Sequence, residues 1–335
     1  MDSLVVRPYE PGDEHAILRS FNLVFGEMGG EGYVDRDLAA WRWAYLDNPA
    51  GMRVHVAVAP DGTIAGHYAA LPVRAVTSVG PTVFAQIVDS FVHPAYRQGL
   101  KRPGLFVHTA QEALATWTSG GDGMFHGMPV ENARRMSVRF LGYTTWRSVD
   151  YLCRASDQGS DVPPAGVELL RVDRPSPDID DLAAEHAAEK GCTNLRTATY
   201  LAWRYARCPS GCYESWEARR AGRLVGFAVL RPVHDLLPQS CTIAELLTRS
   251  GDGEALDALV ACATARARAH GRRRILAVFP PQAREAGALH DRGFESEPSA
   301  RTFFRSIGCR LAQPGLTFSE VGQRWWYTLG DFDLV

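Results

Sequence analysis

A basic, glycine-containing segment, Tyr96–Gly104 (YRQGLKRPG), leads into a stretch with helical character. A helix that begins after a glycine-bearing turn offers unpaired backbone N–H groups and the positive end of its dipole, so it can hold a phosphate or a diphosphate. Two glycines permit the backbone angles of an anion-binding turn and three basic side chains add charge: Gly99, Gly104, Arg97, Lys101 and Arg102. The segment therefore predicts a diphosphate site. It is neither a Walker loop nor a dinucleotide fingerprint, and the alternative is a solvated basic turn.

The chain also repeats itself at a fixed offset, which indicates a tandem duplication of one domain. Seven pairs of identical residues lie 160 positions apart (203 − 43): Trp43/Trp203, Tyr45/Tyr205, Pro49/Pro209, Gly51/Gly211, Gly62/Gly222, Gly66/Gly226 and Pro72/Pro232. Further along, Gly142 corresponds to Gly293 at an offset of 151, so the second copy lacks nine residues (160 − 151). The missing residues fall around Tyr96–Gly104. One copy is therefore equipped for a phosphate-bearing ligand and the other is not.

The elements that position this segment follow from patterning and turn residues. In the first copy we expect strands up to Pro8 and at His55–Ala59, Ile64–Ala70, Val83–Val92, Met124–Met128 and Trp146–Cys153. Helices are expected at Asp13–Phe25, Asp35–Leu46, Leu105–Trp117 and Asn132–Leu141. A linker rich in Asp, Ser, Gly and Pro follows at Asp157–Pro177, and the order then repeats up to a last strand at Trp325–Val335.

Composition excludes several classes of protein. The 335 residues fit two domains of ~150 residues, with 46% hydrophobic and 22% charged residues and no apolar run near the ~18 residues of a membrane helix. A net charge of −2 gives no field for nucleic acid, and the first residues lack a signal-peptide pattern. Seven cysteines without a C-x-x-C pair predict reduced thiols and no metal site. We expect a cytoplasmic monomer or homodimer with no nucleic-acid or membrane partner.

The segment Val88–Arg97 (VDSFVHPAYR) resembles the strand that carries acetyl-CoA in the GNAT acyltransferase superfamily, and the basic loop resembles its pyrophosphate loop. The motifs His126–Pro129 with Asn132, and Leu141–Tyr143, resemble landmarks of a tandem branch of that family. The resemblance covers essentially the whole chain. It implies an α/β (α+β) fold of two tandem GNAT-like domains, each a mixed, largely antiparallel sheet flanked by helices. A catalytic, acyl-CoA-binding domain would span 1–156, and a degenerate domain contributing to the acceptor cleft would span 157–335.

The resemblance implies acetyl-CoA (acyl-CoA) as a co-substrate and no metal. In that family the strand before the loop splays from its neighbour, and its backbone pairs with the pantetheine amides as an added strand would. By the same resemblance, the residues that hold the co-substrate are Phe91, Val92, Arg97, Gln98, Gly99, Leu100, Lys101, Arg102, Gly104, Leu105 and Asn132.

Acyl transfer to an amine needs a base for the amine and an acid for the leaving thiolate. The resemblance places Asp89 where an acidic residue faces the acceptor; the alternative is a carboxylate that caps a loop or pairs with an arginine. His126 would lie where the splayed strands meet, and an imidazole suits proton transfer near neutral pH, although a single strand histidine is also common as a structural residue. Glu131 is a further carboxylate within reach of the acceptor. The family's usual Tyr acid corresponds to Val138, so water or Tyr143 would serve instead, or the thiolate would leave unaided.

The second copy has Glu245 opposite Asp89 and the acidic segment Arg249–Glu254 in place of the basic loop, where carboxylates would repel a diphosphate. Its last residues either wall the acceptor cleft or close the sheet: Trp325, Tyr327, Asp331 and Asp333. We therefore expect an acetyl-CoA-dependent N-acyltransferase that acts on a small amine such as an amino sugar or a metabolite amine. The alternatives are a catalytically silent acyl-CoA sensor or scaffold, and an aminoacyl-tRNA-dependent transferase of the same fold, which the net charge disfavours.

Overall fold

The structure is a computed structural model that describes residues 4–29, 32–97, 104–233, 237–299 and 306–332. The chain forms two compact units, each made of discontinuous segments. Unit 1 comprises Met1–Arg74, Thr82–Trp146 and Ile307–Gly315, and unit 2 comprises Ala75–Pro81, Arg147–Ser306 and Leu316–Val335. Both contain a mixed, mostly antiparallel sheet with helices against it, which confirms the predicted α/β (α+β) class.

The sheet of unit 1 has the strand order β1-β2-β3-β4-β5-β15-β6. Its strands are β1 (Val5–Pro8), β2 (Arg53–Val58), β3 (Ile64–Thr77), β4 (Gly80–Val92), β5 (Asp122–Gly127), β15 (Ser306–Leu311) and β6 (Thr144–Ser148). Strands β4 and β5 run parallel, whereas the pairs β1/β2, β2/β3 and β5/β15 are antiparallel.

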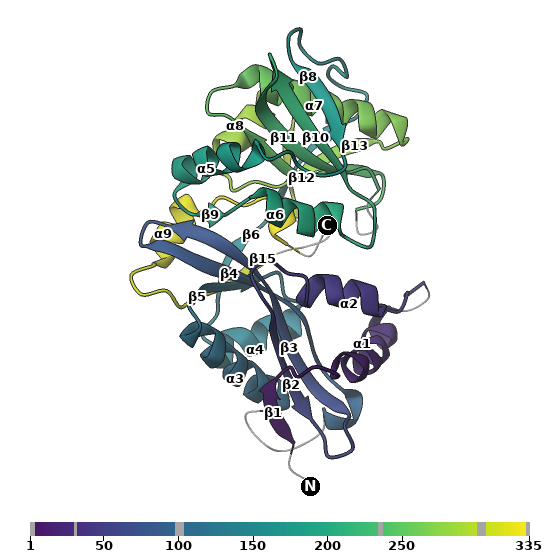
Figure 1. Ribbon diagram of the computed structural model, residues 1–335, viewed down its shortest axis with the longest axis vertical. Coiled ribbons are helices and arrows are strands. Elements are labelled where there is room, and N and C mark those ends of the chain that lie inside the picture. Colours follow the sequence, from purple (N-terminus) through teal and green to yellow (C-terminus); the bar gives the residue numbers. More distant parts are fainter. Residues whose placement is uncertain (1–3, 30–31, 98–103, 234–236, 300–305, 333–335) are drawn as a thin grey trace. The chain divides into compact units, whose positions relative to one another are not determined.

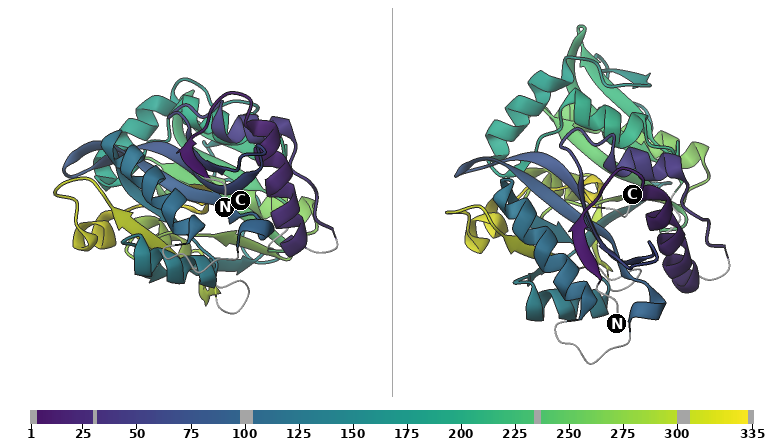
Figure 2. Two further views of the ribbon diagram at one scale, coloured as in Figure 1. Left: turned by 90° about the horizontal axis from the view of Figure 1, so that it is seen from below. Right: turned by 60° about the horizontal axis from the view of Figure 1, so that its bottom comes forward.

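Helices cover both faces of this sheet, because its strands carry apolar side chains on both faces (Figures 1 and 2). The helices are α1 (Glu14–Gly29), α2 (Leu38–Tyr45), α3 (Leu105–Ser119) and α4 (Glu131–Phe140). Phe21 and Trp41 of α1 and α2 pack on one face in a core that includes Val88 of β4. Val107 of α3 packs on the other face in a core that includes Phe125 of β5.

Strand β4 breaks the alternation that a regular strand would show. Val88 and Phe91 lie three positions apart, so strict alternation would place them on opposite faces, yet both pack in the core beneath α1 and α2. Between them, Asp89 has a φ of 53°, a left-handed backbone conformation that few residues other than glycine adopt. This local irregularity has the character of a bulge and shifts the phase of the strand before its end.

Two of the repeated glycine pairs have the same physical role in both copies. Gly62 and Gly222 adopt positive φ values of 81° and 78° in the turns that precede β3 and β11 (Arg223–Arg231). A Cβ atom on Gly66 would lie 3.2 Å from Thr109 of α3, and one on Gly226 would lie 3.0 Å from a methyl group of Leu259. The second pair therefore lets a helix approach the neighbouring strand closely.

Unit 2 contains a second sheet with the order β14-β7-β13-β12-β11-β10-β8. The strands are β14 (Glu295–Pro298), β7 (Asp150–Ala155), β13 (Arg274–Ala277), β12 (Ser240–Thr248), β11, β10 (Glu214–Arg220) and β8 (Glu168–Val172). The helices are α5 (Ile179–Lys190), α6 (Ala198–Leu201), which continues as a π-type turn at Ala202–Ala206, α7 (Gly253–Ala269), α8 (Arg284–His290) and α9 (Phe318–Arg324). The apolar face of α7 packs on this sheet.

Each sheet includes one or more strands from the other half of the sequence, and the first also contains the short β9 (Thr193–Asn194), which pairs with Ala75 and Val76 of β3. Strand β15 pairs with β5 in the first sheet, and β7 pairs with β13 and β14 in the second. The sequence predicts one strand at Trp146–Cys153 in the first copy, but in the structure this stretch divides into β6 and β7, and β7 belongs to unit 2. The units, defined by contacts in space, therefore differ from the copies, defined by the sequence repeat, at residues 75–81, 147–156 and 307–315.

The expected final strand Trp325–Val335 is wrong over its described part. Residues 325–328 make one isolated bridge, between Trp326 and Thr193, and a 3-10 turn follows at Leu329–Asp331. The aromatic side chains Trp325 and Tyr327 are buried within unit 2. Within the described ranges, no helix combines the length and the apolar character needed to cross a bilayer.

A buried histidine makes the stability of the protein depend on pH. His55 of β2 packs edge-on against Trp117, with ring centroids 5.6 Å apart, and burial lowers its pKa to about 4. Because the unfolded chain binds this proton near pH 6.5, we expect the free energy of unfolding to fall as the pH drops from 6.5 to 4, by up to about 3 kcal/mol from this residue. The free energy of unfolding, measured with urea, should differ less between pH 7 and pH 4.5 in His55→Gln than in the wild type. The control His15→Gln, at an exposed position, should show the same difference as the wild type.

Candidate active site

Strands β4 and β5 part within unit 1. Their parallel register runs from Val83 opposite Asp122 to Gln86 opposite His126. Beyond these pairs β4 continues to Val92, whereas β5 ends at Gly127. On its other edge β5 pairs with β15, and there Gly127 lies opposite Gly308. The last residues of β4 therefore extend past the end of their parallel neighbour, and Asp89 lies on this extension.

Asp89 is the centre of a cluster with Arg36 and Tyr45, which we call the Arg36 cluster. Arg36 Nη1 and the Tyr45 hydroxyl both donate to Asp89 Oδ2. The other carboxylate oxygen, Oδ1, has no hydrogen-bond partner among the described residues. The Asp89 side chain retains 15% of its exposure, so this oxygen can accept a hydrogen bond from a ligand.

Arg36 lies between α1 and α2 and is held by contacts on several sides. The Asn22 side chain clamps its backbone: Oδ1 accepts from Arg36 N at 2.9 Å and Nδ2 donates to Arg36 O at 3.0 Å. Its guanidinium carbon lies 4.1 Å from the centre of the Phe21 ring, a cation–π contact. Asp37 caps the start of α2 by accepting from Ala40 N, so the N-cap directly follows Arg36 and the helix begins at Leu38.

The backbone of Asp89 has its own support. His67 Nδ1 lies 2.8 Å from Asp89 O, and because a carbonyl only accepts, Nδ1 is the donor. The His67 ring stacks on Phe91, with centroids 5.2 Å apart and an interplanar angle of 17°. Burial lowers the pKa of His67, which therefore stays neutral and keeps this arrangement. His67 is thus a positioning residue for the left-handed backbone of Asp89.

The charges in the Arg36 cluster are fixed at neutral pH. Burial by itself would raise the pKa of Asp89, but the Arg36 charge and the hydrogen bonds from Arg36 and Tyr45 lower it. Burial and the Asp89 charge raise the pKa of Tyr45 well above its usual value. Asp89 is therefore a carboxylate that binds a proton weakly, and Tyr45 is a neutral hydrogen-bond donor. The interpretation of Asp89 as a partner of an arginine is confirmed, and it is compatible with a role toward the acceptor.

His126 is buried in β5, at the last register pair with β4 and opposite Cys309 of β15. Glu131 lies at the start of α4, on the surface, and accepts from Arg134 and Arg135 at 2.8 Å. Hydrogen bonds from these two arginines lower the pKa of Glu131 to about 2, so it is a poor proton acceptor at neutral pH. The catalytic roles of His126 and Glu131 stay predictions.

The predicted co-substrate residues fall into three groups. Phe91 is buried by Phe21 and Phe25, and the carbonyl of Val92 accepts from Arg97 Nε at 2.9 Å. Gly104 precedes α3 as its N-cap, with Leu105 as the first helical residue, and Asn132 is exposed in the first turn of α4. The remaining predicted residues lie outside the described residues: Gln98, Gly99, Leu100, Lys101 and Arg102.

Among the described residues, no side chain caps the start of α3. Gly104 offers no side-chain cap to the first turn, and a Cβ atom built on it would meet nothing within 4 Å. The start of α7 in unit 2 differs, because Asp252 Oδ1 accepts from Ala255 N and both Asp252 oxygens accept from Arg220 at 3.0 Å. A carboxylate of the chain thus already occupies the corresponding helix end in unit 2. Asp252 belongs to the acidic segment Arg249–Glu254, whose carboxylates we expect to repel a diphosphate.

The position of the usual Tyr acid carries Val138, which is exposed on α4. Tyr143, the predicted substitute, is buried, and its hydroxyl lies 3.3 Å from that of Tyr68. Burial raises the pKa of Tyr143 well above its usual value, so the phenol keeps its proton. Its role as an acid stays a prediction.

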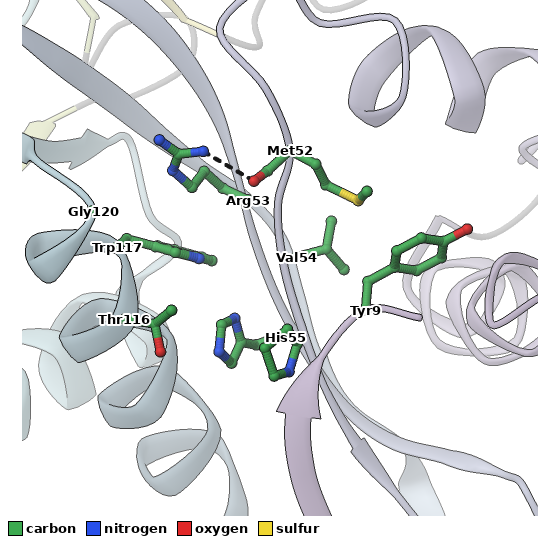
Figure 3. A pocket seen from close by; sticks show the side chains of 9 residues that line it. Tyr9, Met52, Arg53, Val54, His55, Thr116, Trp117 and Gly120 are labelled. Atoms are coloured by element: carbon green, nitrogen blue, oxygen red, sulfur yellow. Dashed lines mark hydrogen bonds between the residues drawn. The ribbon is translucent and has the colours of Figure 1, made fainter. Parts of the chain in front are cut away.

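Figure 3 shows a pocket of about 380 Å³ at another edge of unit 1. It is lined by Pro8, Tyr9, Met52, Arg53, Val54, His55, Thr116, Trp117 and Gly120. Trp117 and Gly120 lie at the end of α3, and with a rise of 1.5 Å per residue this end is about 20 Å from the start at Leu105. The pocket is therefore separate from the predicted diphosphate site, and no predicted site residue lines it.

The same architecture occurs in solved structures of acetyltransferases. A GCN5-related N-acetyltransferase from Anabaena variabilis has a TM-score of 0.65 and 13% identity, over 93% of this chain and 73% of that one. One from Kribbella flavida has a TM-score of 0.63 and 14% identity, over 92% of this chain and 71% of that one. A tandem GNAT protein of the clavulanic acid biosynthesis pathway has a TM-score of 0.53 and 14% identity, over 94% of this chain and all of that one. This chain has the tandem GNAT fold.

The likeness extends to the fold and not to a detectable sequence relationship. No protein-family model matches the sequence. No curated protein matches it either. In the part of the GNAT fold that the structure describes, no group of three or more His, Cys, Asp or Glu residues is placed to hold a metal ion.

Three residues that hold Asp89 in place, directly or through Arg36, were not predicted from the sequence: Arg36, Asn22 and His67. The internal repeat contained a signal for the first, because Arg36 and Arg196 lie at the same offset of 160 (196 − 36) as the Tyr45/Tyr205 pair. No comparable signal marks His67 or Asn22, since their partners are backbone atoms that only the folded chain brings near.

Loss of the Asp89 charge should destabilise unit 1 without altering the backbone. Asn tolerates the left-handed conformation, so Asp89→Asn keeps the local geometry but weakens the hydrogen bonds to Arg36 and Tyr45. We expect the free energy of unfolding to fall by about 1–3 kcal/mol, measured by urea denaturation at pH 7. The control Glu131→Gln alters an exposed carboxylate and should leave stability essentially unchanged. Equal stabilities of Asp89→Asn and wild type would contradict the importance of this cluster.

Proposed function

We propose that the protein is an acetyl-CoA-dependent N-acyltransferase that transfers an acyl group to the amine of a small molecule. The observation that carries the proposal is the Arg36 cluster. It holds an ionised carboxylate with an available oxygen on the part of β4 that extends past β5, in a fold shared with N-acetyltransferases.

Three features fit the co-substrate. The extension of β4 beyond Gln86 is the part of the strand available for pairing with an extended ligand. Among the described residues, the first turn of α3 has no side-chain cap and no atom lies within 4 Å of a Cβ built on Gly104, which fits an anion bound there. Arg97 adds a cation, about half exposed, between these two elements. We therefore assign the diphosphate to the start of α3 and the pantetheine arm to the end of β4.

Bound acetyl-CoA supplies the acyl group: the amine nitrogen bonds to the thioester carbon, the C–S bond breaks, and the proton lost by nitrogen ends on the thiol. Asp89 Oδ1 accepts a hydrogen bond from the acceptor amine and so orients it. Arg36 and Tyr45 hold the carboxylate in place through Oδ2. His67 holds the strand beneath it.

Unit 2 is proposed not to bind the co-substrate. Asp252 caps α7 and is paired with Arg220, and Glu254 also accepts from Arg220, at 2.9 Å. A diphosphate would have to displace one carboxylate and approach another, which like charge opposes. The acceptor class of amino sugars or metabolite amines, the cytoplasmic location and the monomeric or dimeric state stay predictions.

Release of free thiol from acetyl-CoA tests the function. Purified protein is incubated with acetyl-CoA and a panel of amines that includes amino sugars, polyamines and amino acids, and thiol is followed with a chromogenic disulfide. We expect saturable release with at least one amine and reduced release with Asp89→Asn. Saturable CoA binding without release from any amine would instead support the acyl-CoA sensor, which the valine at position 138 favours.

A substitution at the start of α3 tests where the co-substrate lies. Gly104→Glu places a carboxylate beside the proposed diphosphate in open space, so we expect CoA affinity to fall roughly 3- to 30-fold, measured by calorimetry. Gly104→Ala adds no charge and should retain affinity, and Glu254→Gln at the start of α7 should have no effect. Equal losses from Gly104→Glu and Glu254→Gln would reject the assignment of CoA to the first copy.

A further inference from the structure

The Arg36 cluster has a counterpart in unit 2. Arg196 and Tyr205 lie 160 positions after Arg36 and Tyr45 (196 − 36, 205 − 45), and they surround Glu245 of β12. Arg196 Nε donates to Glu245 Oε2 at 3.0 Å, and the Tyr205 hydroxyl donates to Glu245 Oε1 at 2.9 Å. We call these three residues the Arg196 cluster. The duplication therefore preserved an arginine, a tyrosine and a carboxylate in each copy.

The surroundings of the two clusters are also alike. An aromatic ring lies against each guanidinium, Phe21 at 4.1 Å from Arg36 and Trp326 at 4.6 Å from Arg196. The strand that carries the carboxylate is irregular in both, since β12 has a register shift that leaves out Ala244, the residue before Glu245. The two clusters thus have the same composition and the same kind of surroundings in both copies of the fold.

Arg196 has more partners than Arg36, since its Nη1 also donates to Thr193 Oγ1 and Asn194 O, and the difference that bears on ligand binding is a second carboxylate. In unit 2, Asp331 Oδ2 accepts from Arg196 Nη2, so this arginine binds two carboxylates. Asp331 is held there by Asn194 Nδ2 at 2.6 Å and by Thr328 N at 2.8 Å. The neighbouring Gly330 is pressed against the cluster, and a Cβ atom on it would overlap the Tyr205 hydroxyl. The segment 328–331 therefore covers the Arg196 cluster, and Asp331 is buried. Of the two alternatives for Asp331, this favours closure of unit 2 over a wall of the acceptor cleft.

In unit 1 the second position on the arginine is open. Among the described residues, Asp89 is the one carboxylate that accepts from the Arg36 guanidinium, which also interacts with the Tyr45 hydroxyl. The Arg36 side chain keeps 29% of its exposure, against 0% for Arg196. A guanidinium has five N–H donors in a planar fork that matches a carboxylate, and most of those of Arg36 are unused.

We infer that the acceptor amine carries a carboxylate, which binds Arg36 in the position that Asp331 occupies on Arg196. This inference rests on the proposed function. The carboxylate binds the open edge of the guanidinium, and the amine of the same molecule binds Asp89 Oδ1. An amino acid, with opposite charges a few bonds apart, complements the Arg36–Asp89 pair. A neutral or purely cationic amine leaves the open edge of Arg36 unpaired.

Matched pairs of acceptors test this inference on the intact protein. Glycine, alanine, β-alanine and 4-aminobutanoate are compared with their carboxamides, which keep the amine and remove the negative charge, and kcat/KM is measured from thiol release. For at least one pair we expect the amino acid to be preferred roughly 10- to 100-fold. Arg36→Gln should reduce this preference to about one, and Arg36→Lys should retain part of it. Arg19→Gln, an exposed arginine on α1, should keep the full preference.

The outcomes separate this inference from the proposed function. If the carboxamides, or amines without any carboxylate, react as well as the amino acids, the inference is wrong while the acyltransferase activity stands. A preference that persists in folded Arg36→Gln also overturns it. If no amine of either panel releases thiol, both the inference and the proposed function fail. The preference of the wild-type protein is informative even if Arg36→Gln does not fold.

Discussion

The ion pair between Arg36 and Asp89 joins the connection between α1 and α2 to the irregular part of β4, 53 positions further along the chain. The hydrogen bond from Tyr45 to Asp89 joins the end of α2 to the same part of β4. A non-glycine residue in the left-handed region costs of order 1–3 kcal/mol, and such strain persists only where neighbouring contacts over-determine it. Here Arg36 and Tyr45 hold the side chain, and His67 holds the carbonyl. The irregular strand and the charged cluster therefore depend on each other.

The Arg36 cluster of unit 1 and the Arg196 cluster of unit 2 differ in how the charge of the arginine is paired. In unit 1 one arginine is balanced by one carboxylate, and both remain partly exposed. In unit 2 one buried arginine is balanced by two carboxylates, and the second comes from the end of the chain. Buried charges are tolerated only when they are paired and hydrogen-bonded, which Asn194 and Thr328 complete. The same ancestral cluster is therefore a structural centre in unit 2 and an open site in unit 1.

The helix ends follow the same division. The first turn of α3 in unit 1 has no side-chain cap, whereas α7 in unit 2 is capped by Asp252, which Arg220 holds. At the arginine and at the helix start, unit 2 places one of its own carboxylates, Asp331 or Asp252, where an anion could bind. Unit 2 fills both positions from its own sequence, whereas in the described part of unit 1 no carboxylate of the chain occupies either.

The sequence by itself determined the duplication, the fold class and the acidic character of the second helix end, because these depend on local residue types and on a repeat that survives as spaced glycines and aromatics. It also marked Asp89, and the offset of 160 linked Tyr45 to Tyr205. Only the tertiary structure decided which sheet receives β7 and β15, since short strands carry no signal for one edge over another. It also decided that Asp331 closes the Arg196 cluster while Arg36 stays open, because an ion pair between residues 135 positions apart exists only once the chain has folded.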